Sequence, residues 1–297
     1  MNPDLTFLIV GAGKAASTRI FKWLDEHPQV CMAHPKEPQI FSLHYDVASR
    51  DAWEQFFQHY RGEPQVGEAT PGYLHLPYVP RRIAATCPEA KILVSLRHPV
   101  ERAYSDWWMH HARGDDAEGF ERAMRICLER SDRADADAEL SWIEHANSTG
   151  SGQIRARPYL EIGHYDEHLA RYREHLAEER IKAVLFDDLR DSPEVVYGEV
   201  CEFLGIAGVA INSEAANPAP NPLLERARRL RHGRVGRTAS KLIPRPARAA
   251  VKALLTRHGA ARPPMPAGTR AWLLDYYAPH NERLAHRIGR DLSHWNS

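Results

Sequence analysis

The sequence predicts an α/β protein with a central parallel sheet flanked by helices. Short apolar runs, partly β-branched, lie at 6–10, 91–96 and 181–186, and each is typical of a buried strand. Stretches with a helical spacing of apolar residues separate these runs, and alternating strands and helices indicate a parallel sheet. The 297 residues are enough for a sizeable core, and we expect one domain over 1–297.

The overall composition is that of an ordinary globular protein. Basic and acidic residues number 39 each, so no net field favours nucleic acid as a partner. The four cysteines are far apart and form no C-x-x-C pair, which favours reduced thiols over a disulfide or zinc framework. The sequence shows no signal peptide and no apolar run of transmembrane length, so we expect a cytoplasmic protein.

The strand at 6–10 is followed by a loop of small residues and then by a helical pattern over 17–27. A loop of this kind gathers backbone N–H groups at the start of a helix, where an anion can bind. Lys14 adds a mobile positive charge, and Ser17 and Thr18 add hydroxyl donors on the first turn. The pattern favours a phosphate or sulfate site over an ordinary strand-to-helix turn.

Two nucleotide-binding motifs can be compared with this loop. The Walker A motif fails, because Ala15 stands where a serine or threonine should follow the lysine. The dinucleotide fingerprint G-x-G-x-x-G/A matches at Gly11, Gly13 and Ala16, although no carboxylate follows the next predicted strand at 30–32 to hold a ribose. An NAD(P)-dependent oxidoreductase is therefore one alternative function.

The segment GAGKAAST resembles the 5′-phosphosulfate loop, roughly G-x-x-K-x-G-T-T, of sulfotransferases that use 3′-phosphoadenosine-5′-phosphosulfate (PAPS). The resemblance implies a P-loop NTPase-like sulfotransferase fold, with PAPS as co-substrate and no metal. Lys14 would also stabilise charge that develops on the bridging oxygen. The residues that it assigns to the phosphosulfate are Gly11, Gly13, Lys14, Ala15, Ala16, Ser17 and Thr18.

Lys36 and Glu37 follow the predicted strand at 30–32, at the end where ligands bind in open α/β sheets. From the residues alone they could equally be a solvated ion pair. However, K-E-P-x-x-F resembles the segment with the catalytic glutamate in the branch of the family that includes heparan sulfate sulfotransferases. The resemblance makes Glu37 the general base and Lys36 an acceptor contact.

Two more segments resemble parts of the family that border the acceptor. Residues 66–74, VGEATPGYL, are similar to E-K-T-P-x-Y, with Tyr73 matching and Ala69 in place of a common lysine. Tyr165 lies in a G-x-Y pattern at the start of a helix. The acceptor implied is a carbohydrate or another hydroxylated small molecule, contacted by Lys36, Tyr73 and Tyr165.

Arg97 directly follows the strand at 91–96, and a helix is predicted from Pro99. Ser105 is expected on the face of that helix that is directed towards Arg97. A guanidinium and a hydroxyl placed in this way can bind a phosphate together. The pattern L-R-x-P-x-x-R-x-x-S closely resembles the family's 3′-phosphate motif. Arg262 stands where the family has a basic loop over the same phosphate.

Two segments carry no recognisable motif. Residues 113–158 read as a helical and loop insertion near the acceptor, and 223–262 is strongly basic. The basic segment could be a lid over the donor, a dock for an acidic acceptor or a peripheral membrane contact, and a polyanion- or membrane-binding protein is the second alternative function. Asp187 and Asp188 have no third metal ligand at a suitable spacing, and the oligomeric state is not indicated.

We therefore expect an enzyme that transfers a sulfuryl group from PAPS to a hydroxyl, with an amine as the second choice of acceptor group. Glu37 and Lys14 are its expected catalytic residues.

Overall fold

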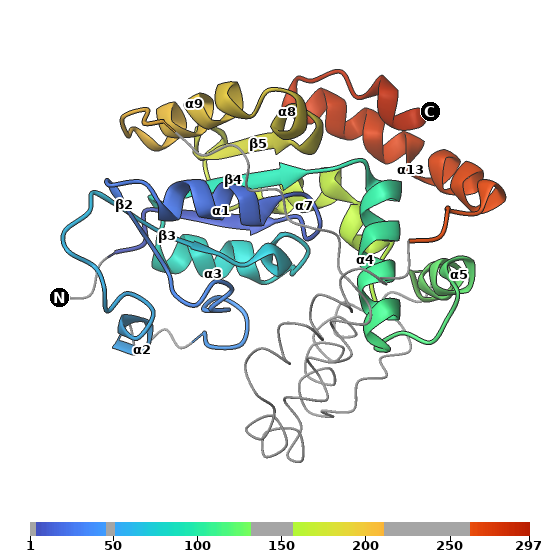
Figure 1. Cartoon of the computed structure of the whole chain (residues 1–297), viewed down its shortest axis with the longest axis horizontal. Coiled ribbons are helices and arrows are strands. Elements are labelled where there is room, and N and C mark those ends of the chain that lie inside the picture. Colours follow the sequence, from blue (N-terminus) through green and yellow to red (C-terminus); the bar gives the residue numbers. More distant parts are fainter. Residues whose placement is uncertain (1–3, 46–50, 132–156, 211–261) are drawn as a thin grey trace, which may run out of the picture. The chain divides into compact units, whose positions relative to one another are not determined.

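The computed structural model describes residues 4–45, 51–131, 157–210 and 262–297 (Figure 1). These residues form two compact units. The first unit takes in the described residues up to 102, then 162–210 and 273–297, and the second takes in 103–131, 157–161 and 262–272. Most of the predicted insertion and of the basic segment lies outside the described residues, so their roles stay predictions.

The first unit is built on a five-stranded sheet with the order β2-β3-β1-β4-β5, and every pairing is parallel. The parallel sheet predicted from the sequence is thus confirmed. Its order differs from the 3-2-1-4-5 order of classic dinucleotide-binding folds. The strands are β1 (Phe7–Gly11), β2 (Val30–Met32), β3 (Gln65–Ala69), β4 (Lys91–Leu96) and β5 (Ile181–Leu185).

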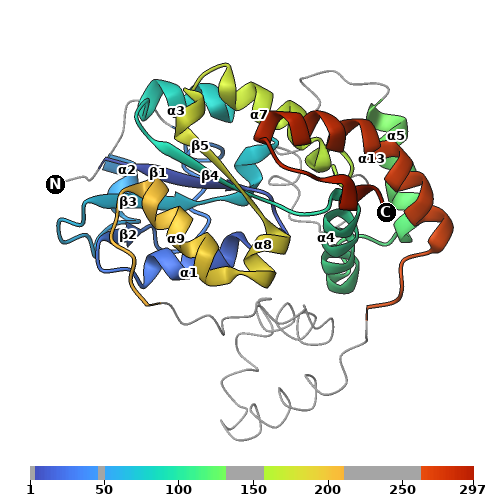
Figure 2. The ribbon, with the colours of Figure 1, turned by 90° about the horizontal axis from the view of Figure 1, so that it is seen from above.

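Helices cover both faces of the sheet, with α1 and α9 on one face and α3 and α7 on the other (Figure 2). Short 3-10 turns follow several elements, among them η1 (Pro71–Leu74) directly after β3. The helices of this unit are α1 (Ser17–Asp25), α2 (Asp51–Glu54), α3 (Val79–Thr86), α7 (Tyr165–Arg173), α8 (Phe186–Asp191) and α9 (Pro193–Leu204), and most of α13 (Ala267–Ile288) belongs to it as well.

The core between the sheet and the α1/α9 layer follows from the period of two along the strands. Phe7 and Ile9 of β1 and Leu93 of β4 point to this face and are fully buried. They meet Ile20 of α1 and Val196 of α9 in one cluster. Removing such side chains from water stabilises the fold by about 25 cal/mol for each Å² of apolar surface.

Strand β3 was not predicted from the sequence, where four strands were expected and the sheet has five. Its sequence, QVGEA, contains a glycine and a charged residue, and both weaken the apolar pattern of a buried strand. The strand forms because β2 and β1 offer it a hydrogen-bonding partner on each side. Gly67 is needed there, since a Cβ atom at this position would overlap the Phe7 ring.

Replacing Gly67 by alanine should therefore lower the free energy of unfolding by about 1–3 kcal/mol, the usual cost of overpacking a core. Urea unfolding followed by circular dichroism measures it. Gly198→Ala is the matched control, because Gly198 lies on α9 with open space around it. The control should leave stability unchanged or raise it by up to about 1 kcal/mol. Equal stability of the two variants would contradict this account of β3.

The second unit contains most of α4 (Pro99–Arg113), α5 (Phe120–Ser131) and the first residues of α13. Aromatic packing joins α4 to α5, because the ring centroids of Tyr104 and Phe120 lie 4.7 Å apart, and the Trp107 ring stacks on Tyr104 at 5.5 Å within α4. Trp107 Nε1 donates a hydrogen bond of 3.0 Å to the Glu118 carbonyl. Within the described ranges, none of the helices has the length and apolar character needed to cross a membrane.

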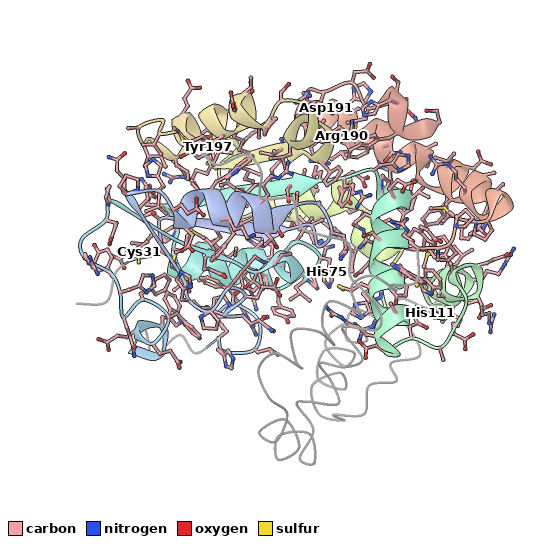
Figure 3. The ribbon with its side chains drawn as sticks, viewed as in Figure 1. Cys31, His75, His111, Arg190, Asp191 and Tyr197 are labelled. Atoms are coloured by element: carbon pink, nitrogen blue, oxygen red, sulfur yellow. The ribbon has the colours of Figure 1, made fainter. Side chains whose placement is uncertain are left out.

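All four cysteines are free and buried, as their spacing predicted. Cys31 on β2 lies with its thiol 3.6 Å from His59 Nε2 (Figure 3). Burial, with smaller contributions from Glu63 and Asp25, raises the pKa of this thiol to about 11. A thiol with such a pKa stays protonated near neutral pH and is a weak nucleophile.

Candidate active site

The loop after β1 presents the start of α1 to the carboxyl edge of the sheet. Helix α1 begins at Ser17, as predicted, and the residues before it include left-handed backbone at Lys14 and Ala16, each with φ of 70°. No side chain caps the amino end of α1. The Arg19 N–H donates to the Ala16 carbonyl at 2.8 Å, so the first-turn N–H groups open to an anion are those of Ser17 and Thr18.

The fold requires a glycine at position 11 for a reason other than dinucleotide binding. A Cβ atom there would lie 2.6 Å from Leu74 Cβ and 2.9 Å from the Pro71 carbonyl oxygen. Gly11 thus lets η1 pack closely against the end of β1. A Cβ atom at Gly13 would meet nothing within 4 Å. Packing among the described residues therefore does not require the second glycine of the fingerprint.

Arg97 lies at the end of β4 and contacts the Lys14 loop. Its Nη1 donates a hydrogen bond of 3.3 Å to the Lys14 carbonyl. The guanidinium also lies 4.6 Å above the centroid of the Phe186 ring, which restricts its orientation. Tyr165, at the start of α7, donates a hydrogen bond of 3.0 Å to the Arg97 carbonyl. The structure therefore brings Lys14, Arg97 and Tyr165 together, and an acceptor contact by Tyr165 stays a prediction.

Lys36 and Glu37 form an ion pair of 2.7 Å in the loop that follows β2. The Glu37 side chain is 53% exposed and that of Lys36 17% exposed, so the carboxylate faces solvent. Glu37 has a positive φ of 65°, a conformation that a glutamate adopts only when its surroundings hold it. A hydrogen bond of 3.1 Å from the Glu37 N–H to the Ala69 carbonyl supplies one such restraint.

Two more backbone N–H groups fix the rest of this loop (36–41), which we call the base loop after the role that the sequence resemblance implies for Glu37. The Gln39 N–H donates to Thr70 Oγ1 at 3.4 Å, and the Phe41 N–H donates to the Tyr73 hydroxyl at 2.9 Å. Tyr73 is fully buried. Its hydroxyl holds the base loop through the Phe41 N–H. The direct acceptor contact expected of Tyr73 stays a prediction.

Glu68 on β3 matches the glutamate of the E-K-T-P-x-Y pattern, but the sequence predicted no role of its own for it. It is 0% exposed, and Thr70 Oγ1 donates a hydrogen bond of 2.8 Å to its Oε2. Burial raises the pKa of this carboxyl to about 7, although the hydroxyls of Thr70 and Tyr73 act in the opposite direction. A glutamate inside a stretch that also matches an acceptor-binding motif was the available signal.

Ser105 and Arg262 lie in the second unit, whereas Arg97 lies in the first. The Arg262 guanidinium stacks 3.9 Å above the Tyr104 ring, one residue before Ser105 on α4. The Tyr104 hydroxyl donates a hydrogen bond to the Pro263 carbonyl. The two residues expected at the 3′-phosphate are thus held at the same part of α4.

Asp187 and Asp188 each face partners other than a metal. Asp187 accepts from Arg190 at 3.0 Å and from Trp295 Nε1 at 3.3 Å, and Asp188 pairs with Arg290 at 2.8 Å. Arg190 also pairs with Asp191 at the surface of α8 (Figure 3). The pair therefore ties the end of β5 to the C-terminal segment.

One group among the described residues could offer three metal ligands: ligand atoms of His164, Glu167 and His280 lie within 4.8 Å of one another. The His164 and His280 rings, however, stack in parallel at 4.2 Å, so their in-plane lone pairs do not converge on one point. Burial is the main cause that lowers the pKa of His164 to about 3. The arrangement fits a packing contact between α7 and α13 better than a chelating site.

Comparison with known proteins agrees with this geometry. The family model described as "Sulfotransferase domain" matches residues 7–216. The human bifunctional heparan sulfate N-deacetylase/N-sulfotransferase 3 is 25% identical over 304 residues, which cover 97% of this chain and 31% of that protein. The human N-deacetylase/N-sulfotransferase 1 is 27% identical, with coverage of 97% and 30%. The chain spans about a third of the length of these relatives.

Among solved structures, a sulfotransferase from Alicyclobacillus acidocaldarius is similar with a TM-score of 0.70 and 23% identity, covering 99% of this chain and 100% of that one. This likeness confirms the fold predicted for the chain. The family model covers well over half of the sequence and includes β1 to α9, the elements that carry Lys14, Glu37 and Arg97. The chain therefore belongs to the sulfotransferase family.

Proposed function

We propose that the protein transfers a sulfuryl group from PAPS to a hydroxyl, or to an amine, of a carbohydrate or another small molecule. One observation carries the proposal: the Arg97 guanidinium contacts the Lys14 loop at the carboxyl edge of the sheet. This contact joins the ends of β1 and β4, which are adjacent strands. Two cationic side chains at one edge suit a donor that bears phosphates at both its 3′ and 5′ positions.

Lys14 and the uncapped N–H groups of α1 would bind the 5′-phosphosulfate. Arg97 would bind the 3′-phosphate, and the family resemblance assigns Ser105 and Arg262 to the same phosphate. The backbone of the loop supports this role, because Lys14 and Ala16 are left-handed and such residues occur in the backbone nests that bind anions.

In the transfer step the acceptor oxygen or nitrogen forms a bond to sulfur, while the bond between sulfur and the bridging phosphate oxygen breaks. The Glu37 carboxylate takes the proton that the acceptor loses, and its exposed position leaves room for an acceptor to approach. Lys14 stabilises the negative charge that develops on the bridging oxygen. Adenosine 3′,5′-bisphosphate and the sulfated acceptor are the products.

The acceptor class is supported by the relatives, which are named as heparan sulfate N-sulfotransferases. The chain differs from the family pattern at Ala69, the last residue of β3, which is buried in the core cluster. A lysine that contacts the acceptor or the sulfuryl group from this position is therefore missing. We therefore expect the protein to prefer a different acceptor from these relatives, which can be tested.

The test is transfer of radioactive sulfur from labelled PAPS to a panel of acceptors that includes N-desulfated heparan sulfate, an unsulfated polysaccharide and simple phenols. We expect labelled product from at least one acceptor, with one adenosine 3′,5′-bisphosphate released for each sulfate transferred. Lys14→Ala should abolish transfer, because its charge meets both the bound donor and the leaving group. The proposal fails if NAD(P) raises the melting temperature in a thermal-shift assay while adenosine 3′,5′-bisphosphate does not.

A further inference from the structure

Glu68 combines features that a purely structural residue of a central strand does not need. It lies on β3, which pairs with β2 on one side and β1 on the other. Its side chain is fully buried, yet it carries an ionisable group. Its Oε1 has no hydrogen-bond partner among the described residues. A buried carboxylate oxygen without a partner is costly, and such an atom in a folded protein calls for an explanation.

Thr70 connects Glu68 to the base loop. The Thr70 hydroxyl donates to Glu68 Oε2 and accepts from the Gln39 N–H, so one side chain bonds both partners. On either side of that link, Glu37 and Phe41 donate their N–H groups to Ala69 and Tyr73. Every one of these acceptors lies within five residues of Glu68 in the sequence. The end of β3 and η1 are thus the support on which the base loop rests.

The charges around Glu68 also belong to the base loop. Lys36 and Glu37 are the charged side chains near enough to influence its ionisation, Lys36 favouring the carboxylate and Glu37 opposing it. The other titratable groups facing Glu68 are Tyr73 of η1 and Tyr172 of α7, whose pKa values burial and the Glu68 charge raise well above the usual range. Both tyrosines are therefore neutral, and Lys36 of the base loop is the opposite charge that acts on Glu68 among the residues described.

We propose that Glu68 is a positioning residue for the general base: it holds the base loop through Thr70, and its negative charge attracts Lys36 away from Glu37. This inference rests on the proposed function, because it assigns Glu37 the role of base. Lys36 pairs with the exposed Glu37 at 2.7 Å, and its charge also favours the ionised form of the buried Glu68. When Glu68 is ionised, Lys36 neutralises Glu37 less completely, and Glu37 accepts the acceptor proton more readily.

Glu68→Gln tests the role of the charge, since glutamine keeps the shape and imitates the protonated acid. At pH 6 the wild-type Glu68 is mostly protonated, and the variant should match its kcat within about twofold. At pH 8 the wild-type residue is ionised, and the variant should be about tenfold slower, the size of one charge-assisted hydrogen bond. The KM for PAPS should not change at either pH. Glu63→Gln, an acidic residue in the loop before β3, is the matched control.

A ratio of wild-type to variant kcat that stays constant between pH 6 and 8 would overturn the proposal, whether that ratio is one or ten. A constant tenfold loss would mean that Glu68 only maintains the fold. The stability of the two proteins supplies an internal check on ionisation. Because folding raises the pKa of Glu68 from 4.5 to about 7, its contribution to stability is full below pH 4.5 and is lost as the pH rises towards 7.

Thr70 offers a second test in case Glu68→Gln does not fold. Thr70→Val removes the hydroxyl that links Glu68 to the base loop, and Thr70→Ser keeps it. We expect amide hydrogen exchange at Gln39 to be at least tenfold faster in Thr70→Val than in the wild type, and kcat to fall, with both restored in Thr70→Ser. Equal exchange in the two variants would overturn the proposed link.

The exchange measurement requires no acceptor and no transfer, so it separates the two claims. If the wild-type protein transfers no sulfate but Thr70→Val loosens the base loop, the proposed function fails and the mechanical link stands. If the wild-type protein is active and neither Glu68→Gln nor Thr70→Val alters its kcat or its pH profile, Glu68 does not position the base and the sulfotransferase assignment stands.

Discussion

Glu37→Gln should lower kcat for sulfate transfer by about 10²–10⁴-fold, the range expected when a general base is removed. Glutamine preserves the size of the side chain and can still hydrogen bond with Lys36, but it cannot take the acceptor proton. The affinity for adenosine 3′,5′-bisphosphate should stay nearly unchanged, because Glu37 is assigned no contact with the donor's phosphates. Initial rates with labelled PAPS and calorimetry with the bisphosphate measure the two quantities separately.

The matched control is Glu54→Gln, which changes an exposed glutamate at the end of α2 and should leave both quantities unaltered. His110 and His111 on α4 are rival candidates for the base, and His110 lies 3.6 Å from Asp106 and 3.5 Å from Asp115. Full activity in Glu37→Gln together with a large loss in His110→Ala would show that the base is the histidine. The donor site could remain as described in that case.

Arg97→Ala should weaken binding of adenosine 3′,5′-bisphosphate by about tenfold to a hundredfold, since a hydrogen bond to a charged group contributes roughly 1.5–3 kcal/mol. The variant should bind AMP as the wild type does, because AMP lacks the 3′-phosphate. Arg81→Ala, which removes an exposed arginine of α3, is the matched control and should bind the bisphosphate normally. An equal loss of affinity for AMP would place Arg97 at the 5′ end of the donor.

The strands of the fold could be predicted where their sequences are continuous apolar runs. Phe7–Gly11, Lys91–Leu96 and Ile181–Leu185 could be predicted because each is mostly apolar. Burial along nearly the whole strand explains this for β1 and β4, whereas the first three residues of the edge strand β5 are half-buried. β3 was not found, since Gly67 and Glu68 interrupt the pattern. Only the folded structure shows why these two residues stand in a strand. Gly67 faces the Phe7 ring, and Glu68 is linked to the base loop through Thr70.

The candidate site could be predicted in part for a similar reason. Lys14, Glu37 and Arg97 each follow a strand of a parallel sheet, and topology alone places such positions at one edge. The burial of Tyr73 and the contact of Tyr165 with Arg97 depend on the packing of η1 and α7, which the sequence pattern does not encode. The same holds for the link from Glu68 to the base loop.

Calorimetric titration of the wild-type protein with adenosine 3′,5′-bisphosphate and with AMP tests the central claim most directly. The claim is that the loop at Lys14 and the arginine at 97 bind the two ends of a nucleotide that carries a 3′-phosphate. The account predicts binding of the bisphosphate that is tighter than that of AMP by at least about tenfold, the contribution of one charged phosphate contact. Equal affinity for the two nucleotides would contradict it.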